Sequence, residues 1–137
     1  MAFSKNLAGV SIHGEGLSDN DVLNIEKAIG IIFPSDYKEF LKTANGCEGM
    51  FNGKNYAILW SGGDLLRYNK EYQVDEFLEG MLLIGSDGGG EAFAFDKVNE
   101  MAIVHVPFVG MERALAVKIS DSFSGFLDLL CNKVLYE

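Results

Sequence analysis

The stretch Leu82–Asp96, LLIGSDGGGEAFAFD, determines how the chain folds. It begins with an apolar run, passes through three consecutive glycines and ends in a segment where large and small apolar residues alternate. A period of two is typical of a β-strand, so we expect Phe93 and Phe95 on one face of a sheet. Ala92 and Ala94 then lie on the opposite face. The stretch therefore predicts a β-hairpin in which glycines supply positive φ angles.

The glycine run lacks the features of a phosphate-binding loop. Such a loop leads into a helix N-terminus, where backbone N–H groups and the helix dipole favour an anion. Gly88–Gly90 leads into a strand instead, without a Walker Lys-Ser/Thr pair or GxGxxG spacing. Asp87, Glu91 and Asp96 would repel a phosphate. The EF-hand order of acids is also absent, so the sequence predicts no nucleotide site and gives no support for a calcium site.

The elements on both sides of this hairpin follow from periodicity and end signals. Helices are predicted at residues 18–30, 34–46, 64–72 and 123–134. Strands are predicted at residues 55–60, 81–85, 91–96, 101–108 and 114–119. The first helix begins with a capping box formed by Ser18 and Asp21, and either Ser120 or Ser122 caps the last helix.

The order of helices, then strands, then one closing helix favours an α+β fold over alternating α/β. We expect a single domain over residues 1–137, with a core of about residues 18–134. The N-terminal helices and the C-terminal helix should pack on one face of a mainly antiparallel sheet. A length of 137 residues suits one domain.

Composition points to a cytoplasmic protein. The N-terminal stretch has no sustained apolar segment of the kind found in signal peptides, and no apolar run approaches the ~18 residues that a membrane helix needs. The chain has 2 cysteines, which makes a disulfide framework improbable and a reducing compartment the default.

The net charge of −9 is concentrated in one part of the chain. Residues 71–100 hold eight acids against the single base Lys97, so this segment alone carries −7. Such a charge argues against nucleic acid or an anionic membrane as a direct partner. Two interpretations remain: a solvated face that keeps the chain soluble, or a surface that steers a cationic partner.

No catalytic or metal-binding constellation assembles from the sequence. His105 lies between valines and is expected to be a hydrogen-bonded strand residue, and His13 lies in a glycine-flanked segment for which we expect mobility. Neither forms an HxxxH or HExxH spacing. Cys131 is expected to be buried on the last helix and Cys47 to be partly exposed, with nothing that marks either thiol as activated.

Three aromatic residues cluster beside the acidic segment: Trp60, Tyr68 and Tyr72. We expect Trp60 to belong to the core. The two tyrosines either cover the edge of the sheet or belong to a binding surface, because Trp and Tyr are enriched at interface hot spots.

The ordered set of motifs resembles the SUKH superfamily, also called the Smi/Knr cell-wall-regulator family. The motifs that carry the resemblance are FPSDYKEFLKTANG (33–46), YAILW (56–60), LLIGSDGGGEAFAFD (82–96) and SFSGFLDLL (122–130). They run from about Ser18 to Leu130 and so cover nearly the whole chain. The resemblance implies an α+β fold with helices on one side of a sheet, and a function exerted by binding.

Many bacterial members of this family resemble immunity proteins that neutralise polymorphic or contact-dependent toxins, often nucleases. Fungal members are regulatory interaction proteins with added disordered arms; we expect no such arms here, which favours the compact bacterial type. The resemblance therefore implies a non-enzymatic immunity protein that binds a cationic toxin domain, with no cofactor, no metal and no catalytic residue. The residues expected to contact the partner are Tyr68, Tyr72, Asp75, Glu76, Glu79, Asp87 and Glu91.

Two other functions stay open at this point. One is a regulator or scaffold that binds a housekeeping partner through the same surface. The other is a small-molecule or metal-binding protein that uses a pocket near Trp60 and the glycine turn.

Overall fold

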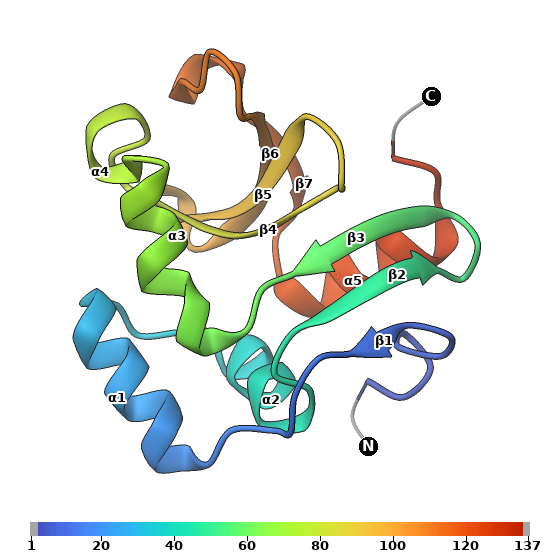
Figure 1. Cartoon of the computed structure of the whole chain (residues 1–137). Coiled ribbons are helices and arrows are strands. Elements are labelled where there is room, and N and C mark those ends of the chain that lie inside the picture. Colours follow the sequence, from blue (N-terminus) through green and yellow to red (C-terminus); the bar gives the residue numbers. More distant parts are fainter. Residues whose placement is uncertain (1–2, 136–137) are drawn as a thin grey trace.

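A seven-stranded antiparallel sheet runs through the computed structural model, which describes residues 3–135 (Figure 1). Its strands are β1 (Ser11–Ile12), β2 (Cys47–Phe51), β3 (Asn55–Leu59), β4 (Met81–Ser86), β5 (Glu91–Asp96), β6 (Ala102–Pro107) and β7 (Val117–Ser120). The order of the strands in the sheet follows their order in the chain. Helices accompany the sheet, so the predicted α+β class with a mainly antiparallel sheet is confirmed.

The helices begin and end largely where local signals place them. They are α1 (Asp19–Ile29), α2 (Ser35–Thr43), α3 (Leu65–Glu71), α4 (Val74–Phe77) and α5 (Phe123–Asn132). The predicted capping box of α1 is confirmed, because the Ser18 side chain accepts from the Asp21 N–H while the Asp21 carboxylate accepts from the Ser18 N–H. Gly30 ends α1 in the left-handed region, and Ser122 is the residue that caps α5.

The glycine turn joins β4 to β5 as a hairpin, as the sequence predicts. Of its three glycines, Gly88 adopts a positive φ of 81°. The carboxylate of Asp87 closes the turn by accepting the N–H groups of Gly89 at 2.7 Å and Glu91 at 3.2 Å. Asp87, one of the residues expected to contact a partner, therefore stabilises the turn itself.

The alternation of β5 divides the interior into two cores. Phe93 and Phe95 belong to a large core that also contains the apolar side chains of α2 and α5. Ala92 and Ala94 belong to a second core on the other face, where Val74 and others from the α4 region pack against β4, β5 and β6. The prediction that only one face of the sheet is covered is therefore wrong for its centre. The small alanine side chains leave room for α4 to approach.

Several local predictions also need correction. Neither β1 nor β2 is predicted, and the segment around His13 is tied to the sheet by a 2.9 Å hydrogen bond from its N–H to the Gly46 carbonyl. Cys47 is fully buried in β2 rather than partly exposed, and burial raises the pKa of its thiol to about 12. The strand predicted from residue 114 begins at Val117, because residues 113–115 form a 3₁₀ turn.

Helix α5 is held at both ends by side chains from distant parts of the chain. At its N-terminus, the Asp36 carboxylate accepts from the N–H of Ser124 at 2.9 Å. At its C-terminus, the Asn55 amide donates to the carbonyls of Leu130 and Lys133 at 2.8 and 2.6 Å. Helix ends leave unpaired backbone groups, and these contacts satisfy several of them while fixing α5 against the sheet.

Replacing Asn55 by alanine should therefore lower the free energy of unfolding by about 1–3 kcal/mol, because buried carbonyls lose their donor. Asn132→Ala is the matched control, since its exposed amide makes a local bond to Asp128 within α5. The control should change stability by less than about 0.5 kcal/mol. Urea unfolding of both variants measures the difference, and equal losses would contradict the role given to Asn55.

Candidate binding groove

A groove of about 570 Å³ opens on the face of the sheet that carries the second core. Its lining comes from residues far apart in the sequence: His13, Glu48, Ile58, Trp60, Asp64, Tyr68, Tyr72, Ser86, Gly88, Gly89 and Phe108. Glu48 and Ile58 are cross-strand partners in β2 and β3, so they share this face. The groove lies where the sequence places a pocket, near Trp60 and the glycine turn.

A row of aromatic rings forms one wall of the groove. The ring centroids of Trp60 and Tyr68 are 4.5 Å apart, and those of Trp60 and Tyr72 are 6.3 Å apart with nearly parallel planes. Tyr72 continues the row to Phe108 at 4.8 Å. Trp60 is half-buried and packs against both cores, so its predicted core role is confirmed in part and one side of it lines the groove.

Helix α3 carries the tyrosine part of this wall, with Tyr68 inside it and Tyr72 at its C-terminal end, and Asn69 attaches the helix to β4. The Asn69 amide group accepts from the Leu83 N–H at 2.8 Å and donates to the Leu83 carbonyl at 3.0 Å. These two bonds replace strand pairing at the point where β3 has ended, since the last β3 partner on β4 is Gly85. The side chain thus satisfies an otherwise open strand edge and sets the position of Tyr68 and Tyr72.

The acidic side chains of the groove are fixed by neighbours. The Glu48 carboxylate accepts a short hydrogen bond from the Tyr56 hydroxyl and lies 3.4 Å from His13 Nε2. The hydrogen bond raises the pKa of Tyr56, because it favours the neutral hydroxyl. Asp64 accepts from the Ser61 hydroxyl at 3.0 Å and pairs with Arg67 at 3.1 Å. The groove therefore combines exposed ring surface with carboxylates of defined orientation.

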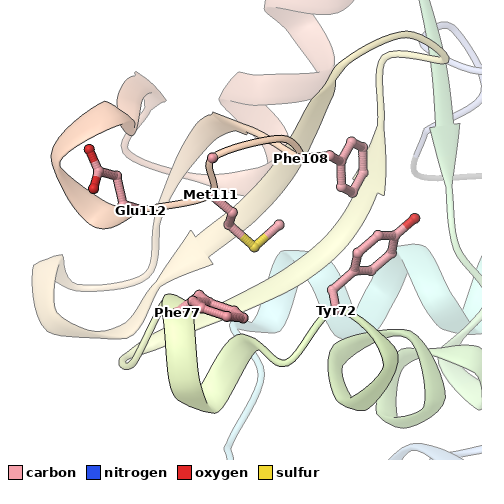
Figure 2. Close-up of a pocket in the computed structure, with 6 residues that line it drawn as sticks. Tyr72, Phe77, Phe108, Met111 and Glu112 are labelled. Atoms are coloured by element: carbon pink, nitrogen blue, oxygen red, sulfur yellow. The ribbon is translucent and has the colours of Figure 1, made fainter.

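A second hollow of about 340 Å³ adjoins the first and shares Tyr72 and Phe108 with it (Figure 2). Figure 2 shows Phe77 of α4 on one side and Met111 on the other, with the Met111 thioether directed into the space between Phe77 and Tyr72. Glu112 stands at the rim. The two hollows together make a continuous aromatic surface along the α3–α4 side of the molecule.

The loop that carries Phe108 and Met111 is anchored by Arg113. Its guanidinium pairs with the buried Asp96 carboxylate at 3.0 Å and donates to the Glu79 carbonyl at 2.8 Å. Burial disfavours the charged form of Asp96, but hydrogen bonds from Asn99, Arg113 and the Val98 N–H outweigh it and hold the pKa of Asp96 below its usual range. The wall of the second hollow therefore depends on an ionised carboxylate.

The structure brings part of the predicted contact set together. Tyr68 and Tyr72 both line the groove. Asp75, Glu76 and Glu79 are exposed on α4 and the turn after it, and Asp75 lines a separate small cavity beside Lys70 and Lys97.

The last two predicted contact residues are engaged within the fold. Asp87 holds the glycine turn. Glu91 lies 2.7 Å from His105 Nδ1, which confirms the prediction that His105 is a hydrogen-bonded strand residue. Glu91 also alternates with Ala92 along β5, which places it on the opposite face of the sheet from the groove.

Several lining residues escape sequence reasoning. Glu48 and Asp64 lie outside the acidic segment, and Phe108 directly follows the proline that marks the end of β6. The sequence offers one signal for the adjoining hollow, namely an aromatic residue, Phe77, placed among the acids Asp75, Glu76 and Glu79.

Chemical groups for metal binding are not gathered in this region. Among residues 3–135, no group of three or more His, Cys, Asp or Glu side chains is arranged to hold a metal ion. Within the same residues, no helix has the length and apolar character needed to cross a membrane.

These features define an α+β domain with an antiparallel meander and an aromatic groove on its open face. The chain belongs to the SMI1 / KNR4 family (SUKH-1), whose model matches residues 16–129. It is also 44% identical over 68 residues to the uncharacterized protein YnaB of Bacillus subtilis (strain 168). That match covers 50% of this chain and 42% of the relative, so it spans less than half the length of YnaB.

The Asp96–Arg113 pair predicts a pH dependence. Arg113→Ala should lower the free energy of unfolding by about 1–3 kcal/mol at pH 7, because a buried carboxylate loses charge-assisted hydrogen bonds. A lowered folded-state pKa stabilises the protein above the ordinary aspartate value of about 3.9, and this stabilisation is lost as the pH falls through the lowered pKa. The difference in the free energy of unfolding between the wild type and the variant should therefore become smaller below about pH 4.

Urea unfolding between pH 7 and pH 3 measures this difference. Lys118→Ala is the control, because it removes an exposed ion pair with Asp121 that is expected to contribute at most about 1 kcal/mol. If the difference in the free energy of unfolding between wild type and Arg113→Ala stays constant down to pH 3, the stabilising role given to the ionised Asp96–Arg113 pair is contradicted.

Proposed function

We propose that this chain is a non-enzymatic immunity protein of the cytoplasm, which binds a cationic toxin domain and blocks its active site or substrate surface. The observation that carries the proposal is the partly exposed row of aromatic rings beside an acid-rich surface. Aromatic anchors surrounded by charge that steers the partner are the usual features of tight protein interfaces. Family membership supports a role in binding, because the resemblance to bacterial SUKH proteins implies immunity function.

The acids of α4 and of the turn after it supply the charge for steering. Asp75, Glu76 and Glu79 are exposed, and within residues 3–135 their carboxylates form no ion pair. Phe77, the last residue of α4, lies between Glu76 and Glu79 in the sequence and lines the second hollow. Free negative charge next to exposed aromatic surface suits a basic partner such as a nuclease domain, because nucleases tend to be basic where they meet nucleic acid.

The first experiment is a pull-down from the native host with the whole chain as bait, at low and high salt, followed by mass spectrometry. Recovery of the C-terminal domain of a large secreted protein, weakened by salt, is the expected result. Growth rescue when this chain is co-expressed with that domain then tests neutralisation. Recovery of an unrelated housekeeping protein, with no rescue, would overturn the immunity role in favour of a regulator.

The steering role of α4 gives a kinetic prediction for the captured partner. The double reversal Glu76→Lys with Glu79→Lys should slow association by about tenfold or more at low salt and flatten its salt dependence. Glu15→Lys with Glu39→Lys is the matched control, because it changes the net charge equally at exposed acids outside the acidic segment. Stopped-flow measurements compare the association rates of the two double variants. If both slow association equally, a localised steering surface is contradicted.

A further inference from the structure

The groove contains two ring-and-carboxylate arrangements, of which one already holds an arginine. Arg67 lies over the Tyr68 ring, with its guanidinium carbon 4.5 Å from the ring centroid, and it pairs with Asp64 at 3.1 Å. A guanidinium plane stacks well on an aromatic face while its N–H groups reach a carboxylate. This local contact stacks an arginine on one ring of the wall and pairs it with an acid of the groove.

The second arrangement has rings and a carboxylate but, within residues 3–135, no lysine or arginine paired with that carboxylate. Trp60 and Tyr72 present nearly parallel rings, 5° apart in plane, and Tyr72 is 39% exposed. Glu48 lies in the same groove. Within residues 3–135 no lysine or arginine pairs with Glu48, whose neighbours are His13 and the Tyr56 hydroxyl. A carboxylate has about four lone-pair sites, so the contacts to His13 and Tyr56 leave Glu48 able to accept from a guanidinium as well.

We propose that the groove binds an arginine side chain of the partner, stacked on Trp60 or Tyr72 and paired with Glu48. This inference rests on the proposed function, because it names the anchor by which a cationic protein is held. Arginine fits better than lysine, because the guanidinium is planar, stacks on rings and donates two parallel hydrogen bonds to one carboxylate. The acids of α4 steer the partner, whereas the groove fixes its register.

The fluorescence of Trp60 gives a direct readout of binding in the groove, because the chain has a single tryptophan. The probe is the peptide acetyl-Gly-Arg-Gly-amide, titrated at low salt against the wild-type protein while Trp60 fluorescence is followed. A saturable change is expected. The citrulline peptide, which has the same shape without the charge, should bind about tenfold more weakly. The lysine peptide should also bind more weakly than the arginine peptide. Equal responses to arginine and citrulline, or to arginine and lysine, would overturn the proposal.

Two variants place the binding within the groove. Glu48→Gln keeps the size of the side chain and should weaken binding of the arginine peptide about tenfold. Glu39→Gln removes one charge from the exposed side of α2 and should leave binding within about twofold. Thermal unfolding of each variant checks that the fold is kept. Equal weakening by both variants would show that net charge alone attracts the peptide, which would overturn the groove assignment.

The inference and the proposed function fail in different ways. If the captured toxin binds Glu48→Gln as tightly as wild type, the arginine anchor is overturned while the immunity role stands. If the peptide binds as expected but the captured partner is a housekeeping protein, the immunity role is overturned and the arginine-binding groove stands.

Discussion

The packing on the two faces of β5 is the constraint on which the rest of the structure depends. On one face, Phe95 meets Tyr37 of α2 with ring centroids 5.0 Å apart, and Phe93 meets Phe126 of α5 at 4.9 Å. On the other face, alanines admit the side chains around α4. Large residues on one side of a strand and small ones on the other thus determine where helices can approach. Since α4 closes over the centre of the sheet, the surface above β2 and β3 stays open, and the groove forms there.

The acidic residues have different structural roles, although each contributes the same formal charge. Asp96 is buried and anchors a loop through Arg113, and Asp87 closes the glycine turn. By contrast, Glu76 and Glu79 make no side-chain contact of this kind within the described residues and stay exposed. A run of acids in the sequence therefore contains two kinds of carboxylate. Some are hydrogen-bonded within the fold, and others are exposed and accessible to a partner. The structural distinction is whether the oxygens already have N–H donors.

Local signals predicted the fold well, whereas the site required tertiary information. Capping by Ser18, the period of two in β5 and the turn before it are short-range patterns, and each appears in the structure as expected. Strand β2 was missed because CEGMF lacks clear alternation and contains Gly49, and its pairing depends on β3. The groove joins residues between His13 and Phe108, so no window of sequence contains it. Tyr68 and Tyr72 could be singled out from the sequence because they cluster with Trp60 beside the acidic segment, and both line the groove, whereas their contact with a partner stays a prediction.

The way α5 is clamped has a consequence for the order of events during synthesis. This helix supplies Phe123 and Phe126 to the large core, and its ends are bonded to Asp36 and Asn55. These partners are separated by more than 70 positions in sequence. Until the ribosome has released residues 123–132, Phe93 lacks its partner Phe126 and the Asn55 amide has no helix to bind. Contacts of such long sequence separation form late and slowly. A nascent chain of this protein therefore leaves the part of the sheet face that α5 covers exposed until that helix emerges, and transiently exposed apolar surface is prone to aggregation.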